Sequence, residues 1–212
     1  MNNNTKYIGL TGVARSGKDT MCMALIKELK NNNLIGRRFS IADGLKASLH
    51  NFILTEFGID TFTTSITDKE IIRPMLVEYG LVKRNLSEGK FLTGKLQEII
   101  DSSLAKEPTD VVIVTDIRYD KFPEDEYFWI TEKNKGGLVH ITKTYEIDRT
   151  LKSGSIFAKT LPANEQERLY DPILEKKADY KVCWESKGDF NEETQHYYLP
   201  YASEVLKYLN II

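Results

Sequence analysis

Short apolar runs alternate with longer amphipathic segments along most of this chain. Residues 111–114 form the clearest run, since all four side chains are β-branched and Pro108 and Asp116 stand near its two ends. Uninterrupted runs of this kind are typical of parallel strands that are covered on both faces. Four further short runs predict strands at residues 7–10, 39–42, 138–142 and 180–184.

Between these runs, apolar residues recur at the three- and four-residue spacing of helices. In residues 44–57, for example, Leu45, Leu49, Phe52 and Ile53 repeat at this spacing. Comparable patterns predict helices at residues 20–30, 68–79, 92–106, 124–133, 165–177 and 201–209, whereas residues 146–164 lack clear periodicity. Because strands alternate with helices, we expect an α/β three-layer sandwich with a mainly parallel sheet of about five strands.

Composition and charge narrow the class of protein. The chain has 212 residues, of which 41% are hydrophobic, and we expect a single domain over residues 1–212. A formal net charge of -2 argues against polymeric nucleic acid as a partner, because proteins that bind it usually carry a basic face. Cys22 and Cys183 stand far apart, which favours a reducing cytoplasm over a disulfide framework or a zinc site. No apolar run approaches the length of a membrane span, so no membrane contact is expected.

The strongest chemical signal is a glycine-bearing segment between the first predicted strand and the first predicted helix. Its sequence is Gly12-Val13-Ala14-Arg15-Ser16-Gly17-Lys18-Asp19-Thr20. Glycines let backbone N–H groups turn inward around an anion, and the positive end of the following helix favours negative charge. Lys18 can then reach the β- and γ-phosphates of ATP. The segment therefore predicts an ATP-binding loop, with Gly12 and every residue from Ala14 to Thr20 as ligands.

This segment departs from the usual phosphate-loop pattern at one position. Ser or Thr normally follows the lysine and offers its hydroxyl to Mg²⁺. Here Asp19 stands at that position, and Thr20 follows one residue later. Asp19 could hold magnesium through water or favour the positive end of the helix. Thr20 could bind phosphate or cap the helix.

Two charged residues follow the strand predicted at residues 111–114. Asp116 stands at the carboxyl end of that strand, the edge at which open α/β sheets bind ligands. It is therefore a candidate for holding magnesium through water, with a loop-capping role as the alternative. Arg118 could clamp a phosphate group or pair structurally with Asp116.

Four later segments, like the loop, resemble motifs of one known protein family. In chain order they are Ser40-Ile41-Ala42-Asp43-Gly44-Leu45-Lys46; Arg73-Pro74-Met75-Leu76 with Tyr79-Gly80 and Arg84; Val114-Thr115-Asp116-Ile117-Arg118-Tyr119; and Ala178-Asp179-Tyr180-Lys181-Val182. Together with the Gly-Lys-Asp-Thr ending of the loop, they resemble the bacteriophage-type deoxynucleoside monophosphate kinases, a branch of the P-loop nucleoside monophosphate kinase family. The resemblance covers residues 7–184. It breaks down at residues 145–165, where the family's His and Ser-Glu pair are replaced by Pro162-Ala163-Asn164-Glu165.

The resemblance implies a P-loop kinase that uses ATP and Mg²⁺ to phosphorylate deoxynucleoside 5′-monophosphates in the cytoplasm, the host's if the chain is viral. It implies an acceptor-binding segment at about residues 43–106, a lid segment at about residues 145–168, and a homodimer. Guanidinium groups present a planar fork to phosphate oxygens. The expected acceptor ligands are Asp43, Lys46, Arg73 and Arg84, and the expected catalytic residues are Lys18, Asp116, Arg118 and Arg149.

Two alternatives remain open at this stage. A P-loop kinase could act on another small acceptor, such as dephospho-coenzyme A or a sugar acid. A protein with this loop could also bind nucleotide as a non-catalytic module. The arginines downstream of the loop favour an acceptor site.

Overall fold

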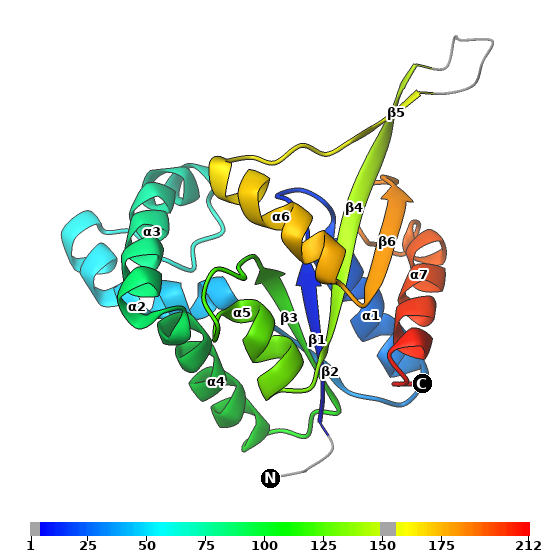
Figure 1. Ribbon diagram of the computed structural model, residues 1–212, viewed down its shortest axis with the longest axis horizontal. Coiled ribbons are helices and arrows are strands. Elements are labelled where there is room, and N and C mark those ends of the chain that lie inside the picture. Colours follow the sequence, from blue (N-terminus) through cyan, green and yellow to red (C-terminus); the bar gives the residue numbers. More distant parts are fainter. Residues whose placement is uncertain (1–4, 149–155) are drawn as a thin grey trace.

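A six-stranded sheet forms the centre of the fold (Figure 1). The computed structural model describes residues 5–148 and 156–212. β1 (Lys6–Thr11) lies in the middle of the sheet, with β3 (Val111–Ile117) parallel to it on one side and β4 (Gly137–Asp148) parallel to it on the other. Because β3 and β4 both run parallel to β1, the carboxyl ends of the three strands lie at the same edge of the sheet, where open α/β sheets bind ligands.

Three outer strands complete the sheet. β2 (Gly36–Ser40) pairs parallel with β3, and β6 (Tyr180–Glu185) pairs parallel with β4. β5 (Ile156–Lys159) pairs antiparallel with the end of β4. The expected mainly parallel sheet is confirmed, with six strands instead of about five. The additional strand β5 lies within residues 146–164, a segment without clear periodicity in the sequence.

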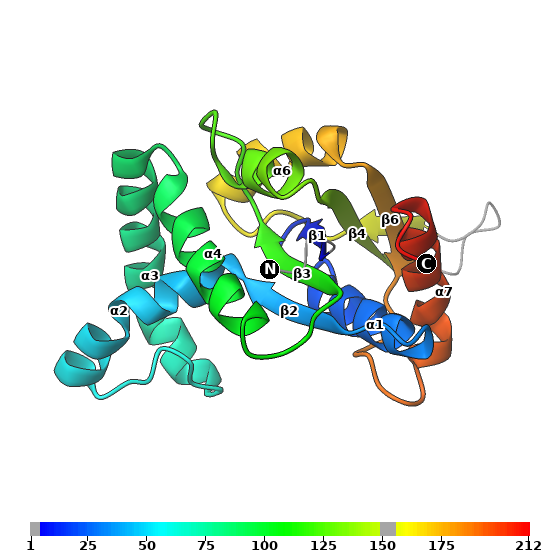
Figure 2. The same cartoon turned by 90° about the horizontal axis from the view of Figure 1, so that it is seen from below.

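Helices cover both faces of the sheet and give three layers (Figures 1 and 2). α1 (Lys18–Asn31) and α7 (Gln195–Tyr208) pack on one face, where their apolar side chains join those of β1 and β6. The opposite face is covered by α4 (Lys90–Leu104), the π-helix η1 (Trp129–Lys133) and α6 (Glu165–Lys177).

The side chains of β3 are buried on both faces of the sheet. They alternate between the two cores, so Val111 and Ile113 lie on the α1 face, while Val112 and Val114 lie on the α4 face. All four are almost completely buried. The uninterrupted apolar run in the sequence follows from this double burial.

α2 (Ile41–Phe57) and α3 (Ile66–Ser87) extend to one side of the sheet (Figure 1). With α4 they make a helical unit of the segment expected to bind the acceptor. The strand predicted at residues 39–42 is wrong in its second half. Ser40 ends β2 and caps α2, because its hydroxyl accepts a hydrogen bond from the backbone N–H of Ala42 at 3.2 Å.

The other predicted helices are present, most of them with shifted ends. α6 has the predicted bounds, α3 continues to Ser87 although Pro74 lies within it, and residues 124–133 divide into α5 (Glu126–Phe128) and η1. Within residues 5–148 and 156–212, none of the helices is both long and apolar enough to cross a membrane.

Candidate phosphate-binding site

The glycine-bearing segment forms a tight loop between the carboxyl end of β1 and the start of α1. Three of its residues have a left-handed backbone: Gly12 with φ 134°, Arg15 with φ 65° and Gly17 with φ 96°. A Cβ atom at position 12 would lie 2.4 Å from the carbonyl oxygen of Ile141, and one at position 17 would lie 2.8 Å from the ring of Trp184. Both backbone conformation and space therefore require glycine at positions 12 and 17.

The loop carries hydrogen-bond donors that lack acceptors. Within the described residues, the backbone N–H groups of Arg15, Gly17, Lys18 and Asp19 have no acceptor. The hydroxyl of Ser16 is completely buried and also has no partner there. A buried polar group without a partner costs about 1–3 kcal/mol. Such a group, beside the positive end of α1, suits a site that receives an anion.

Lys18 begins α1, and its ammonium group folds back onto the loop. Nζ donates hydrogen bonds to the carbonyl oxygens of Gly12 and Val13, each at 2.8 Å. Burial lowers the pKa of Lys18, and the nearby carboxylate of Asp116 partly opposes that shift. A phosphate group beside Lys18 would further stabilise its positive charge.

Asp116 lies near this lysine, at a point where the end of β3 is irregular. Its φ of 70° is unusual for a residue other than glycine, and the pairing of β1 with β3 shifts register at this point. Its Oδ2 accepts a hydrogen bond from the hydroxyl of Ser40 at 3.1 Å. Its Oδ1 lies 3.5 Å from Nη2 of Arg118. The structure therefore brings the three candidate residues Lys18, Asp116 and Arg118 together.

Glu167 of α6 joins Lys18, Asp116 and Arg118 in one cluster, the Lys18 cluster, although its sequence position gave no sign of this role. Its Oε2 accepts hydrogen bonds from the backbone N–H groups of Ala14 at 3.0 Å and Ala163 at 2.9 Å. Its Oε1 accepts one from Nη1 of Arg118 at 2.8 Å. The Asn164-x-x-Glu167 spacing resembles a capping box, and Asn164 does accept from the N–H of Glu167. That signal indicates a helix start but gives no hint of the contact with the loop.

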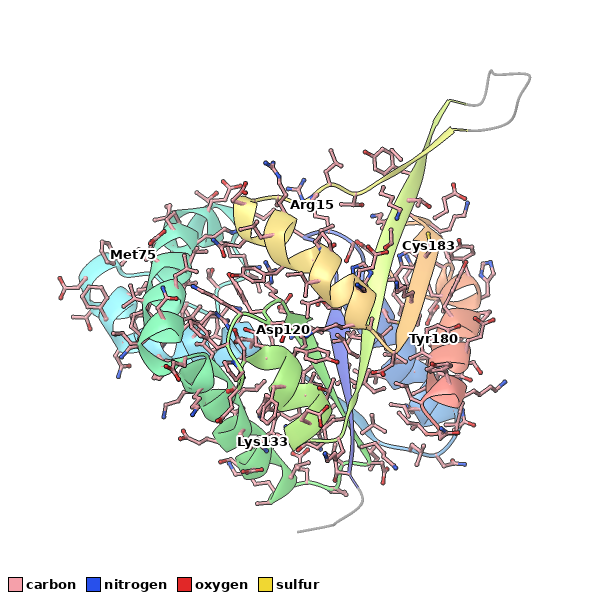
Figure 3. All side chains as sticks on the ribbon, in the orientation of Figure 1. Arg15, Met75, Asp120, Lys133, Tyr180 and Cys183 are labelled. Carbon is pink, nitrogen blue, oxygen red and sulfur yellow. The ribbon has the colours of Figure 1, made fainter. Side chains whose placement is uncertain are left out.

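Among the predicted loop ligands, Asp19 points away from the loop. The carboxylate of Asp19 is 79% exposed and lies 3.3 Å from the guanidinium of Arg38 on β2. Thr20 is partly buried in the first turn of α1, where no side chain caps the helix. Arg15 is exposed, and its side chain extends above the loop near α6 (Figure 3).

Three of the predicted acceptor ligands lie on α2 and α3. Asp43 and Lys46 pair with each other at 3.8 Å, and Lys46 also lies 5.7 Å from the centre of the Phe62 ring. Arg73 is exposed on α3 and has no ion-pair partner in the part of the chain that the structure describes. Its guanidinium is thus available to a ligand.

Arg84, the fourth, is placed differently from the prediction. It is 3% exposed and forms ion pairs with both Asp125 and Glu126. Its guanidinium lies 3.7 Å from the centre of the Tyr119 ring. Because two carboxylates and an aromatic face already enclose it, Arg84 is not available to an acceptor phosphate. We correct its role to a structural one.

Arg84, Asp125 and Glu126 form a buried network, the Arg84 network, that instead holds the segment after β3 in place. Oε2 of Glu126 accepts hydrogen bonds from the backbone N–H groups of Arg118 at 2.6 Å and Tyr119 at 3.2 Å. Arg84 holds Glu126 in place from α3. The buried network therefore orients the backbone from which Arg118 reaches Glu167.

The expected lid is only partly described. Arg149, the candidate catalytic cation, lies outside the described residues. The segment's described parts are the paired ends of β4 and β5, with Lys159 exposed on β5, and the start of α6, which passes over the loop after β1 (Figure 1).

Comparisons with known proteins support the fold and leave the family open. No protein-family model matches the sequence, and no curated protein is found as a relative. A solved structure does match the fold, the crystal structure of TT1252 from Thermus thermophilus. It aligns with a TM-score of 0.50 over 96% of this chain and 98% of that chain, at 13% sequence identity. At this identity the likeness shows a shared α/β fold and nothing about activity.

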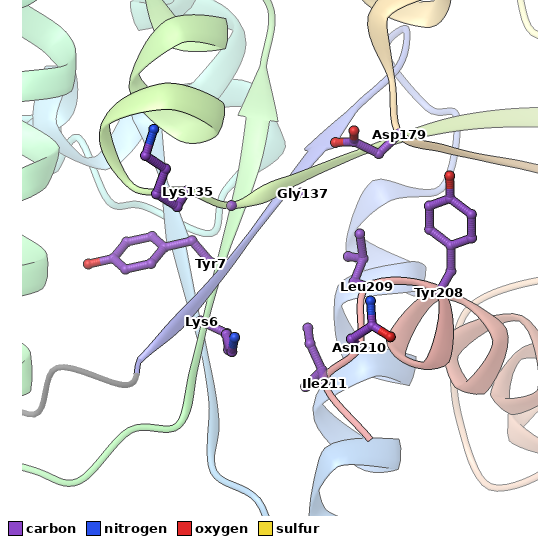
Figure 4. A pocket seen from close by; sticks show the side chains of 10 residues that line it. Lys6, Tyr7, Lys135, Gly137, Asp179, Tyr208, Leu209, Asn210 and Ile211 are labelled. Carbon is purple, nitrogen blue, oxygen red and sulfur yellow. The ribbon is translucent and has the colours of Figure 1, made fainter.

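A hollow of about 270 Å³ lies at the opposite end of the sheet (Figure 4). Its lining includes Lys6, Tyr7 and Gly137 near the amino ends of β1 and β4, and Leu209 after α7. None of its lining residues belongs to the loop or to the Lys18 cluster. The hollow is therefore separate from the candidate site.

The described side chains do not form a metal site on their own. Within residues 5–148 and 156–212, no three His, Cys, Asp or Glu residues gather as a ligand set. A magnesium ion at this site would therefore need oxygen ligands from a bound nucleotide and from water, as is usual for Mg²⁺.

Proposed function

We propose that this protein transfers the γ-phosphoryl group of ATP to a deoxynucleoside 5′-monophosphate. The observation that carries the proposal is the loop after β1. There the ammonium group of Lys18 lies together with the hydroxyl of Ser16 and several N–H groups that have no partner among the described residues. Groups of this kind bind phosphate oxygens. The resemblance of five segments of the sequence to bacteriophage-type deoxynucleoside monophosphate kinases supports the class of acceptor.

Phosphoryl transfer depends on positioning and on stabilising charge. In the reaction, an oxygen of the monophosphate bonds to the γ-phosphorus, and the bond to the β–γ bridging oxygen breaks, so ADP leaves with that electron pair. Lys18 and the loop N–H groups would hold the donor phosphates. Arg118, at the carboxyl end of β3, would stabilise charge on the transferred group.

Magnesium bound with the nucleotide would neutralise charge on the β- and γ-phosphate oxygens. Burial lowers the pKa of Lys18, and among the nearby carboxylates Asp116 opposes that shift most strongly, while the hydroxyl of Ser40 orients Asp116. Asp116 suits a role in holding the hydrated ion through water. Asp19 faces solvent and Arg38 instead.

This difference predicts unequal effects of two substitutions. Asp116→Ala should remove most of the activity and raise the magnesium concentration needed for half-maximal rate, because a carboxylate beside the phosphates is lost. Asp19→Ser should remain active. Titration of the transfer rate against magnesium measures both effects. An inactive Asp19→Ser protein together with an almost unaffected Asp116→Ala protein would reverse the two roles.

Arg73→Ala should weaken binding of the monophosphate more than binding of ATP. Arg73 lies on α3, away from the donor loop, and its guanidinium is unpaired among the described residues. Loss of a charge-assisted hydrogen bond of about 1.5–3 kcal/mol should raise KM for the monophosphate at least about tenfold, with little change in KM for ATP. Lys27→Ala, an exposed cation of α1, is the control and should change neither constant. An equal rise in both KM values would indicate a structural role for Arg73.

A panel of acceptors tests the substrate class. ADP formation should require a deoxynucleoside monophosphate and should be slow with dephospho-coenzyme A, with sugar acids and with water. Preference for one of the other acceptors would keep the kinase and change its substrate. Nucleotide binding with no transfer to any acceptor would indicate a binding module.

A further inference from the structure

An acidic side chain already occupies part of the phosphate loop. The carboxylate of Glu167 accepts a hydrogen bond from the backbone N–H of Ala14, although the two residues are 153 positions apart in the sequence. Glu167 is only 7% exposed. α6 therefore presents a buried negative charge directly to the loop that is expected to bind phosphate.

The groups that donate hydrogen bonds to this carboxylate are of the kinds that bind phosphate oxygens in proteins. One oxygen takes the N–H groups of Ala14 and Ala163, and the other takes the guanidinium of Arg118. Backbone N–H groups and arginine forks are the usual ligands of phosphate in proteins. Lys18 is close enough for the charge of Glu167 to influence it. Glu167 thus resembles a bound anion in both charge and contacts.

A second carboxylate adds to the negative charge around these cations. Asp116 lies 3.5 Å from Arg118, which therefore contacts two acidic side chains at once. With Lys18, the cluster has two cations and two carboxylates. A phosphate group entering the cluster would meet repulsion from both carboxylates unless one of them withdrew.

We propose that Glu167 is an internal anion that competes with a ligand phosphate for the N–H of Ala14 and for Arg118, and so sets the phosphate affinity of the loop. This inference rests on the proposed function, since it assumes that the loop binds phosphate. Binding of phosphate displaces the carboxylate, frees Arg118 to turn to the ligand, and detaches the first turn of α6 from the loop. Glu167 is in this sense a residue that determines affinity, not one that reacts.

A purely structural role makes the opposite prediction. In that case Glu167 holds α6 and the loop in their binding geometry, so its loss would leave phosphate affinity unchanged or weaken it. The contact with Ala163 and the cap from Asn164 are compatible with such a role. Measured affinities separate the two, because competition predicts a gain.

The test is the affinity of the whole protein for inorganic tripolyphosphate, measured by calorimetry. Glu167→Gln should bind it about tenfold more tightly than the unsubstituted protein, a coupling of the usual size for two sites. Glu167→Asp keeps a negative charge at the start of α6 but shortens the side chain, and it should also gain affinity. Glu165→Gln is the matched control in the same turn, since Glu165 is exposed and pairs only with Arg168 among the described residues. It should change affinity by less than about twofold.

The outcomes separate this inference from the proposed function. If the unsubstituted protein binds tripolyphosphate, Lys18→Ala abolishes binding, and both folded Glu167 variants bind equally or more weakly, Glu167 is structural and the inference is wrong. If neither the unsubstituted protein nor the Glu167 variants bind tripolyphosphate, the loop is not a phosphate site and the proposed function fails with it. Thermal unfolding of each variant confirms that the compared proteins are folded.

Discussion

Replacement of Arg84 by alanine should lower the free energy of unfolding by about 3–5 kcal/mol. The substitution would leave Asp125 and Glu126 buried without their cation. Burial already raises the pKa of Glu126 despite the opposing charge of Arg84. Urea denaturation of the two proteins measures the difference in stability. The difference in the free energy of unfolding between the two proteins should become smaller as the pH is lowered, because protonation neutralises the carboxylates left unpaired.

Arg73→Ala provides the control for this measurement. Both arginines lie on α3, but Arg73 is exposed. Its loss should change the free energy of unfolding by no more than about 0.5 kcal/mol. Equal effects of the two substitutions would show that the Arg84 network contributes no more than an exposed surface charge.

Replacement of Lys18 by alanine should reduce phosphoryl transfer at least about a hundredfold, which corresponds to roughly 3 kcal/mol of lost charge stabilisation in the transition state. The fold should persist, because the core on the α1 face is built by other residues. Lys18 is nevertheless buried and holds two loop carbonyl groups, which the sequence alone did not indicate.

A second variant separates charge from packing at this position. Lys18→Met keeps a long apolar stem in the buried site and removes the ammonium group. It should lose as much activity as Lys18→Ala while unfolding at a temperature closer to that of the unsubstituted protein. Steady-state transfer rates and circular dichroism measure the two properties. Near-normal turnover in a folded Lys18→Met protein would contradict a role for the ammonium group.

The sequence predicted those features that depend on neighbouring residues. The apolar run at 111–114 gave a buried central strand, and the periodicity of residues 165–177 gave α6 with the observed bounds. The loop from Gly12 was predicted as a unit because its glycines, lysine and helix start are contiguous. Its left-handed residues and its position after β1 follow directly from that local pattern.

Contacts between distant segments could not be predicted in this way. Arg84 and its carboxylate partners are about forty residues apart, so the sequence could not distinguish a buried pair from a free guanidinium. The contact of Glu167 with the loop depends on how α6 crosses the sheet. Trp184 likewise supports the loop from β6, where its indole N–H donates to the carbonyl oxygen of Ser16 at 3.3 Å. Only the assembled sheet brings these groups together.

The most direct test of the proposed activity is to measure the amounts of both products in the same reaction mixture. The protein is mixed with ATP, Mg²⁺ and a deoxynucleoside monophosphate, and ADP and the deoxynucleoside diphosphate are quantified by chromatography. We expect the two products to appear in equal amounts and at equal rates, and Lys18→Ala to suppress both. Formation of ADP without the deoxynucleoside diphosphate, or of neither product, would contradict phosphoryl transfer to a deoxynucleoside monophosphate.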